Sequence, residues 1–121
     1  MARSEELAWA AGFFDGEGCF STTCPTYIVR DGSRINRRYL RLSVDQKYPE
    51  LLEKFREIVG QGKVYHYQKA AGGSGFKFQA SGRFAFRVAC ALWPYIGEQK
   101  KADFKRSLSL VKESRGGERH R

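Results

Sequence analysis

The chain lacks the sequence features of a membrane-spanning or secreted protein. No apolar run approaches the ~20 residues that a spanning helix needs, and residues 1–6 do not show the charged-then-apolar pattern of a secretory signal. We therefore expect an intracellular protein that makes no contact with a membrane.

Cysteine and histidine are also scarce. The three cysteines, Cys19, Cys24 and Cys90, are an odd number without a CxxC spacing. This argues against a disulfide framework or a structural zinc site and predicts buried or half-buried thiols. The two histidines, His66 and His120, stand alone in the sequence, so we expect neither to bind a metal or act as a nucleophile.

Acidic residues are outnumbered by basic ones. The 121 residues include 22 Lys and Arg against 13 Asp and Glu, a formal net charge of +9, and the sequence pI is about 9.7. Such an excess favours a polyanionic partner, with nucleic acid ahead of an acidic membrane surface. The length suits a single domain, which we assign to residues 1–112, followed by a disordered basic tail over residues 113–121.

The hydrophobic pattern predicts a mixed α+β fold. Its order is α-β-β-α-β-β-α-α, which we interpret as one four-stranded antiparallel sheet backed by helices. The predicted helices cover residues 5–16, with Ser4 as N-cap, and 48–59, 82–92 and 98–112; the predicted strands cover residues 19–29 and 37–46, joined by a turn over 30–34, and 63–68 and 76–80.

The strands alternate between apolar and polar side chains. Leu40, Leu42 and Val44 fall on one face of their strand, whereas Tyr39 and Arg41 fall on the other. The same alternation in the other strands predicts one face that is polar, basic and interleaved with aromatic rings. A solvated antiparallel face is the simple alternative.

Arginine is concentrated before and within the second predicted strand. Five arginines and one aspartate lie between Arg30 and Arg41, a local net charge of +4. This supports phosphate contacts and a marked dependence of binding on salt. A two-stranded ribbon also fits the major groove of DNA, where arginine can bond guanine bidentately. The predicted DNA-binding residues are Ser21, Thr23, Tyr27, Arg30, Arg34, Arg37, Tyr39, Arg41, Ser43, Lys63, Tyr65, Tyr67, Lys77 and Gln79.

The first predicted helix ends in two acids framed by glycines, Asp15-Gly16-Glu17-Gly18. Ala8, Gly12 and Gly16 recur at i, i+4 and i+8, a stripe of small residues against which a second helix could pack closely. Together with Asp15, this stripe is the predicted dimer interface. Asp15 is also expected to stabilise the end of the helix.

Residues 10–18, Ala-Ala-Gly-Phe-Phe-Asp-Gly-Glu-Gly, resemble the LAGLIDADG motif of homing endonucleases. A single copy of the motif implies a homodimer with a saddle-like sheet. The resemblance further implies a site-specific DNA endonuclease of the kind found in mobile introns. It would make a double-strand break in a long pseudo-palindromic target by metal-dependent phosphodiester hydrolysis.

The resemblance also implies the roles of individual residues. Glu17 would be the catalytic metal ligand, assisted by the backbone carbonyl near Gly16, with Mg²⁺ as the first choice of cation and Mn²⁺ or Ca²⁺ able to substitute for binding. Gln46 would position solvent, although a strand-end cap explains it equally well. Lys100, with Lys101 as the alternative, would be the basic residue of the pocket.

One position departs from the family pattern. Glu50 stands where members often carry a basic residue, so either Lys47 replaces that residue or cleavage is slow. A catalytically weak or inactive relative that binds DNA or RNA, such as a transcription regulator or an intron-splicing maturase, is therefore the alternative function. A basic component of an RNA–protein particle is a third. Neither the resemblance nor the composition implies a small-molecule cofactor.

Overall fold

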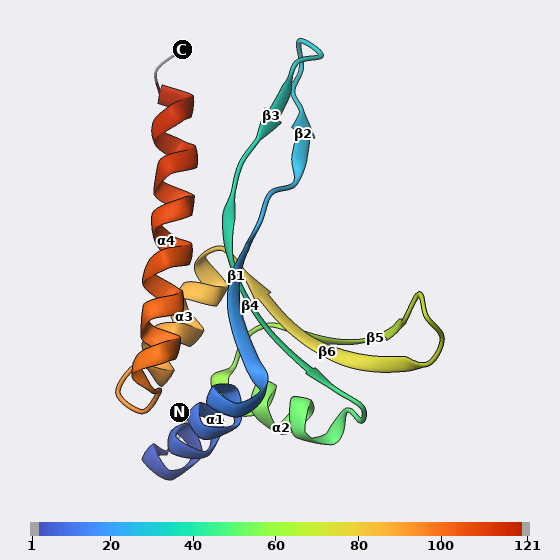
Figure 1. Ribbon diagram of the computed structural model, residues 1–121, viewed down its shortest axis with the longest axis vertical. Coiled ribbons are helices and arrows are strands. Elements are labelled where there is room, and N and C mark those ends of the chain that lie inside the picture. Colours follow the sequence, from blue (N-terminus) through green and yellow to red (C-terminus); the bar gives the residue numbers. More distant parts are fainter. Residues whose placement is uncertain (1–2, 120–121) are drawn as a thin grey trace.

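A computed structural model of the chain describes residues 3–119, and the side chains of residues 3–114. Within this range the order of elements confirms the predicted α+β class (Figure 1). The elements are α1 (Ser4–Glu17), β1 (Gly18–Thr23), β2 (Thr26–Ile28), β3 (Arg34–Asn36), β4 (Tyr39–Gln46), α2 (Glu50–Val59), β5 (Lys63–Gln68), β6 (Ser74–Ser81), α3 (Arg83–Leu92) and α4 (Glu98–Arg119).

The main sheet has four strands in the order β1-β4-β6-β5, and every neighbouring pair is antiparallel. The short β2–β3 ribbon is a separate two-stranded sheet that continues from β1 and β4. In Figure 1 this ribbon and the β5–β6 hairpin reach away from each other, so the sheet is bent like a saddle. The helices lie along its convex side, which leaves the concave side open.

The core lies between the sheet and the helices. Phe14 of α1, Phe55 of α2 and Phe78 of β6 are fully buried, and the ring of Phe55 packs edge-on against Phe78 with centroids 4.9 Å apart. Leu42 and Val44 of β4 are buried in the same cluster. The apolar face predicted from strand alternation is therefore the core face, and the opposite face is open to a partner.

Two segments near the N-terminus differ from the prediction. Helix α1 starts at Ser4, and the N-cap is Arg3, whose backbone N–H donates to the Glu6 carboxylate at 3.0 Å. The prediction of Ser4 as N-cap is therefore wrong, because Glu6 reaches back to the preceding residue. The predicted strand over residues 19–29 is divided into β1 and β2 around Pro25, which has no N–H to donate to a strand ladder.

The last helix is longer than predicted. Buried Val111 anchors α4 near its expected end, and the helix continues to Arg119, because extending a formed helix costs far less than starting one. Residues 113–119 thus belong to α4 where a disordered tail is expected from the sequence, the assignment of residues 1–112 as the domain stays a prediction, and residues 120–121 lie outside the described part of the chain.

The thiols are also placed differently from the prediction. Cys19, Cys24 and Cys90 are free and exposed, not buried or half-buried. For Cys19 the reason is strand alternation, since it precedes the inward-facing Phe20 in β1.

Among the residues described, no helix is both long and apolar enough to cross a membrane.

Candidate active site and nucleic-acid interface

The open face of the sheet carries most of the predicted DNA-binding side chains. Strand register places Ser21, Arg41 and Ser81 in one row, with Ser43, Gln79 and Lys63 in the next. We call this surface the polar face; it consists of Cys19, Ser21, Thr23, Tyr39, Arg41, Ser43, Asp45, Lys63, Tyr65, Tyr67, Gly75, Lys77, Gln79 and Ser81. Sequence reasoning missed Ser81, although alternation along β6 could have placed it there.

Hydrogen bonds and ion pairs orient several of these side chains. The Tyr65 hydroxyl donates to the Gln79 side-chain oxygen at 2.9 Å, and the Lys77 ammonium lies 3.7 Å from the Asp45 carboxylate. Burial, and next the negative charge of Asp45, raises the pKa of Tyr67. These contacts present donors and acceptors in fixed positions.

Two members of the polar face have polar groups that are hidden from solvent. Ser43 is only 7% exposed, and its hydroxyl is 3.3 Å from the Cys19 sulfur, so it offers little surface to a ligand. The Arg41 Nε is buried and has no hydrogen-bond partner in the protein.

The β2–β3 ribbon extends the polar face unevenly. Tyr27 contacts Tyr39, with ring centroids 6.5 Å apart, and a hydrogen bond with Tyr39 raises the pKa of Tyr27. Arg37 lines a hollow with these two tyrosines. Arg34 pairs with Ile28, however, so alternation turns it to the other side of the ribbon, and Arg30 lies exposed at the tip.

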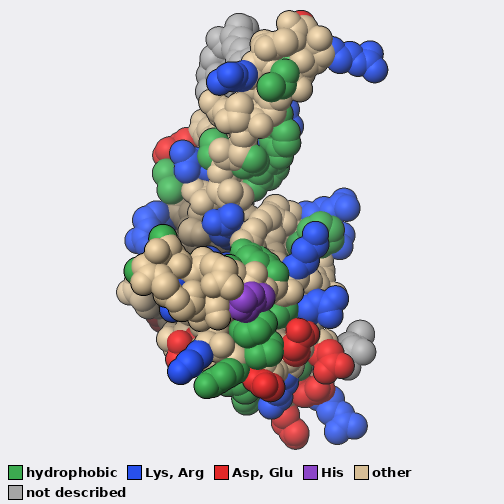
Figure 2. Space-filling view, turned by 90° about the vertical axis from the view of Figure 1, so that its right-hand side faces the viewer, with side chains coloured by type: hydrophobic (Ala, Val, Ile, Leu, Met, Phe, Trp, Pro, Cys, Tyr) green, Lys and Arg blue, Asp and Glu red, His purple; other side chains and the backbone are tan. Residues whose placement is uncertain are grey.

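Charge is separated between the sheet and part of the helical layer. Acidic side chains gather at the lower end of the molecule, where α1 and α2 lie, whereas Lys and Arg side chains occur along its height (Figure 2). The exposed acids of these helices include Glu5, Glu6, Glu50, Glu53 and Glu57. A polyanion would therefore be repelled from this end and attracted to the sheet.

The predicted catalytic residues come from three elements. Glu17 is the last residue of α1 and is exposed. Gly18, which follows it, pairs with Val44 of β4, and Gln46 ends β4 two residues later. Because β1 and β4 are antiparallel, the start of β1 and the end of β4 lie at the same end of the sheet, and so do Glu17 and Gln46.

Lys100 approaches from the first turn of α4. Its ammonium lies 5.9 Å from the ring centroid of Phe14, one turn before Glu17. Lys101 points elsewhere, with its ammonium 5.4 Å from the Trp93 ring and 3.7 Å from Glu98. Of the two lysines that the sequence left as alternatives, Lys100 therefore lies toward the end of α1 and Lys101 lies away from it.

Asp15 fixes the position of α4 relative to α1. Both of its carboxylate oxygens accept a hydrogen bond from the Gly97 backbone N–H, at 3.0 and 3.1 Å. Gly97 immediately precedes α4. Within one chain, Asp15 therefore holds Lys100 near the end of α1.

Helix α1 has an open stripe next to Glu17. Ala8, Gly12 and Gly16 are exposed, and a Cβ atom built on either glycine would meet nothing within 4 Å. Gly18 is different, because a Cβ atom there would collide with the Phe14 ring. Gly18 is required by packing within the chain, whereas Gly12 and Gly16 leave a smooth, unfilled surface.

Comparison with known proteins identifies the family. The sequence profile described as LAGLIDADG endonuclease matches residues 10–84, from the middle of α1 to the start of α3. The chain belongs to the LAGLIDADG endonuclease family. No curated protein sequence gives a significant match.

Solved structures show the same fold. The homing endonuclease I-TnaI is 20% identical with a TM-score of 0.69, covering 98% of this chain and 78% of its own. I-CvuI in complex with its target in the presence of calcium is 23% identical with a TM-score of 0.67, covering 94% of this chain and 70% of its own. I-CeuI complexed with DNA is 14% identical with a TM-score of 0.66, and this chain spans 56% of its length.

In this LAGLIDADG chain the potential metal ligands are few. Among the residues described, no group of three or more His, Cys, Asp or Glu side chains could hold a metal ion. Glu17 offers carboxylate oxygens and Gly16 a backbone carbonyl, the hard donors that Mg²⁺ prefers. One copy alone therefore fits a metal poorly, and two copies joined along the α1 stripe would fit better.

Two basic side chains lie near Gln46. Lys47 and Lys69 line a hollow of about 290 Å³ together with Gln46 and Tyr67. Glu50 itself is exposed at the start of α2. Sequence reasoning proposed Lys47 and missed Lys69, which only the β5–β6 hairpin brings close.

Proposed function

We propose that the chain is a homodimeric, metal-dependent, site-specific DNA endonuclease. Membership of the LAGLIDADG family supports a nuclease, and the relatives I-CvuI and I-CeuI are described in complex with DNA. The observation that carries the proposal is the position of Glu17, exposed between the open stripe of α1 and the polar face. DNA held on that face would pass directly over this carboxylate.

The residues around Glu17 have separate roles in the proposed reaction. Glu17 and the Gly16 carbonyl bind a divalent cation, of which Mg²⁺ is the first choice. When bound, the cation supplies activation of water and stabilisation of the leaving oxygen. Gln46 orients the water by hydrogen bonding, and the Lys100 ammonium neutralises charge on the phosphate.

Two copies of the chain make the site complete. Packing of the Ala8–Gly12–Gly16 stripe against its symmetry mate brings both Glu17 carboxylates to the dyad, where each can serve one DNA strand. The two polar faces then contact the halves of a long pseudo-palindromic target, and both strands are cut near its centre. This is the geometry expected for intron homing.

The small number of potential metal ligands near Glu17 favours a second function, which is binding of nucleic acid without cleavage. Since the described residues of one copy offer no cluster of metal ligands and Glu50 replaces a basic residue, a relative that binds DNA or RNA without cutting would need only the polar face and the dimer. Glu17 would then be dispensable.

Replacing Glu17 by glutamine separates these functions. We expect Glu17→Gln to bind duplex DNA as tightly as the unmodified protein and to lose cleavage by at least about a hundredfold, because an amide is a weak ligand for a hard cation. The measurements are nicking of supercoiled DNA from a target library with Mg²⁺, and binding by fluorescence anisotropy. Glu53→Gln, an exposed acid on α2, is the matched control and should cut normally.

Either of two results would count against the enzyme. If the unmodified protein never nicks any member of the library with Mg²⁺ or Mn²⁺, the binding function replaces the endonuclease. If Glu17→Gln cuts as fast as Glu53→Gln, the assignment of the metal ligand is wrong.

A further inference from the structure

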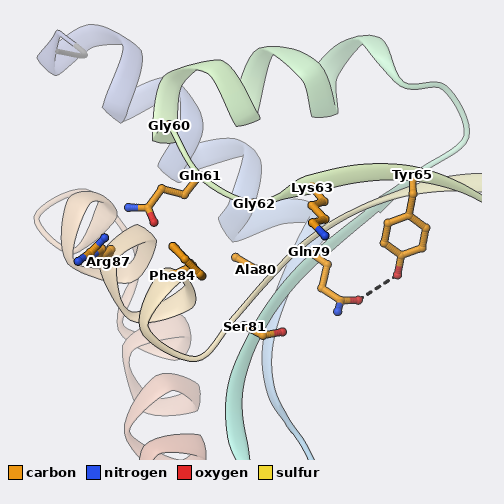
Figure 3. Close-up of a pocket in the computed structure, with 10 residues that line it drawn as sticks. All are labelled: Gly60, Gln61, Gly62, Lys63, Tyr65, Gln79, Ala80, Ser81, Phe84 and Arg87. Carbon is orange, nitrogen blue, oxygen red and sulfur yellow. Dashed lines mark hydrogen bonds between the residues drawn. The ribbon is translucent and has the colours of Figure 1, made fainter.

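A hollow of about 740 Å³ lies where the polar face meets α3 (Figure 3). Lys63 and Tyr65 of β5 and Gln79 of β6 belong to both surfaces. The remaining walls come from the end of β6, from the segment between α2 and β5, and from the first turns of α3. Because Ser81 at this end of β6 pairs with Arg41, whereas Phe76 pairs with Gln46, the hollow is remote from the predicted catalytic end.

The charge of the hollow suits a polyanion. Lys63 and Arg87 line it from opposite sides, and its lining contains no acidic residue. Both cations are exposed. A nucleic-acid strand that follows the polar face could therefore continue into the hollow without meeting a negative charge.

One wall is an exposed aromatic ring. Phe84 is 43% exposed, although it belongs to a helix whose inner residues Ala85, Val88 and Ala89 are fully buried. Its ring is directed toward the space between Gln61 and Ala80. An exposed ring beside cations is the arrangement on which unstacked bases bind.

Gln61 adds an acceptor that the protein does not use. Its side-chain oxygen is buried and has no hydrogen-bond partner. Two glycines with positive φ, Gly60 (+73°) and Gly62 (+96°), flank it, and the Arg56 Nε donates to the Gly62 carbonyl at 3.1 Å. These features constrain the backbone on both sides of Gln61, and the desolvation of its side-chain oxygen is uncompensated.

We propose that this hollow binds one unstacked nucleobase of a DNA strand that leaves the polar face. The base stacks on Phe84, one of its N–H groups donates to the Gln61 oxygen, and Lys63 and Arg87 contact the adjoining phosphates. The four bases all carry N–H groups, so the site would prefer unpaired over paired DNA with little preference for sequence. The proposal rests on the proposed function only in taking DNA as the ligand of the polar face.

The test compares duplexes of the same sequence that differ in one flank. The first is fully paired, the second carries a single-stranded thymidine flank, and the third carries an abasic flank with the same phosphates. We expect the thymidine flank to strengthen binding about tenfold over the abasic flank, measured by fluorescence anisotropy at fixed salt without divalent metal. Phe84→Ala should abolish this difference, and Gln61→Leu should reduce it several-fold.

Phe86→Ala is the matched control. Phe86 is 44% exposed on the same helix, but it lines a different hollow with Leu108 and Val111, so its removal should leave the preference for the thymidine flank unchanged. Thermal unfolding of each variant identifies any loss of folding. If Phe84→Ala alone fails to fold, Gln61→Leu carries the test.

The outcomes separate this inference from the proposed function. Equal binding of thymidine and abasic flanks by the unmodified protein would overturn the base site, and the remaining affinity would then be a phosphate contact only. Cleavage of paired DNA would still support the endonuclease in that case. Conversely, a Phe84-dependent preference for thymidine would support the base site even if the separate nicking assay with Mg²⁺ or Mn²⁺ shows no cleavage and so contradicts the endonuclease.

Discussion

Gly62 is the residue whose backbone most narrowly limits substitution. Its φ of +96° lies in the region that side chains rarely adopt, and a Cβ atom there would collide with the Phe78 ring and lie 3.1 Å from the Gln79 carbonyl oxygen. Since Phe78 is fully buried, neither neighbour can move away easily. The backbone of Gly62, in the turn that follows α2, therefore packs directly against the buried ring of Phe78.

We expect Gly62→Ala to lower the free energy of unfolding by about 3 kcal/mol, the sum of a strained φ and an overpacked contact. Gly72→Ala is the control, because Gly72 has the same φ of +96° but open space around it. It should cost only the strain, about 1 to 2 kcal/mol. Urea unfolding measures both, and equal losses would show that the contact with Phe78 carries no energy.

At the scale of elements, α1 has two different faces. Its inner face carries Ala10, Ala11 and Phe14, which are fully buried. Its outer face carries the stripe of Ala8, Gly12 and Gly16. A Cβ atom added at either glycine would meet no other atom of the chain within 4 Å. Glycine inside a helix is destabilising by roughly 0.5–1 kcal/mol relative to alanine. Two exposed glycines therefore lower the stability of α1 without any benefit visible in a single copy. Close packing of a second copy against them would explain their presence.

Gly12→Leu tests this interface. The fold should remain intact, because the site is open within one chain, but the larger side chain should separate two packed helices and convert dimer to monomer. Gly12→Ala serves as the size control and should weaken the dimer much less. Analytical ultracentrifugation gives the mass of each variant. A Gly12→Leu protein that stays dimeric, or an unmodified protein that is monomeric at micromolar concentration, would contradict the proposed interface.

At the scale of the whole molecule, the net charge of +9 is not spread evenly. Exposed acids gather on α1 and α2, while the polar face and the β2–β3 ribbon are rich in Lys and Arg. Such a distribution disfavours approach of a polyanion to the end of the molecule where α1 and α2 lie. Affinity for DNA should then depend strongly on ionic strength.

We expect the logarithm of the binding constant to fall linearly with the logarithm of salt concentration, losing about a thousandfold or more between about 50 and 200 mM for the dimer. Arg30→Gln, at the exposed tip of the ribbon, should reduce the slope by about one for each phosphate contact that it removes. Arg106→Gln, on α4 and paired with Asp103 at 2.6 Å, should leave the slope unchanged. A slope near zero would mean that the polar face does not contact phosphates.

Local pattern alone determined much of the fold. The alternation of Leu40, Leu42 and Val44 with polar neighbours predicted the core face of β4 correctly, because side chains on a strand must point to alternate sides. The helical spacing of Leu52 and Phe55 likewise identified the buried face of α2. The resemblance to the family rested on residues 10–18, where glycines in the third and last places and acids in the sixth and eighth match the motif, together with the order of the elements.

Only the tertiary structure decided how distant segments meet. Asp15 and Gly97 are far apart in sequence, yet their hydrogen bond sets where Lys100 lies. The pairing of β6 with both β4 and β5 likewise brings Lys69 near Gln46, and the packing of α3 places Phe84 in one hollow with Gln61. Periodicity assigns a side chain to a face, but neighbours across the sheet depend on strand order and helix packing. The sequence by itself thus determined the elements, their buried faces and the motif, whereas the packing of α4 and the β5–β6 hairpin decided the surroundings of Glu17 and created the hollow.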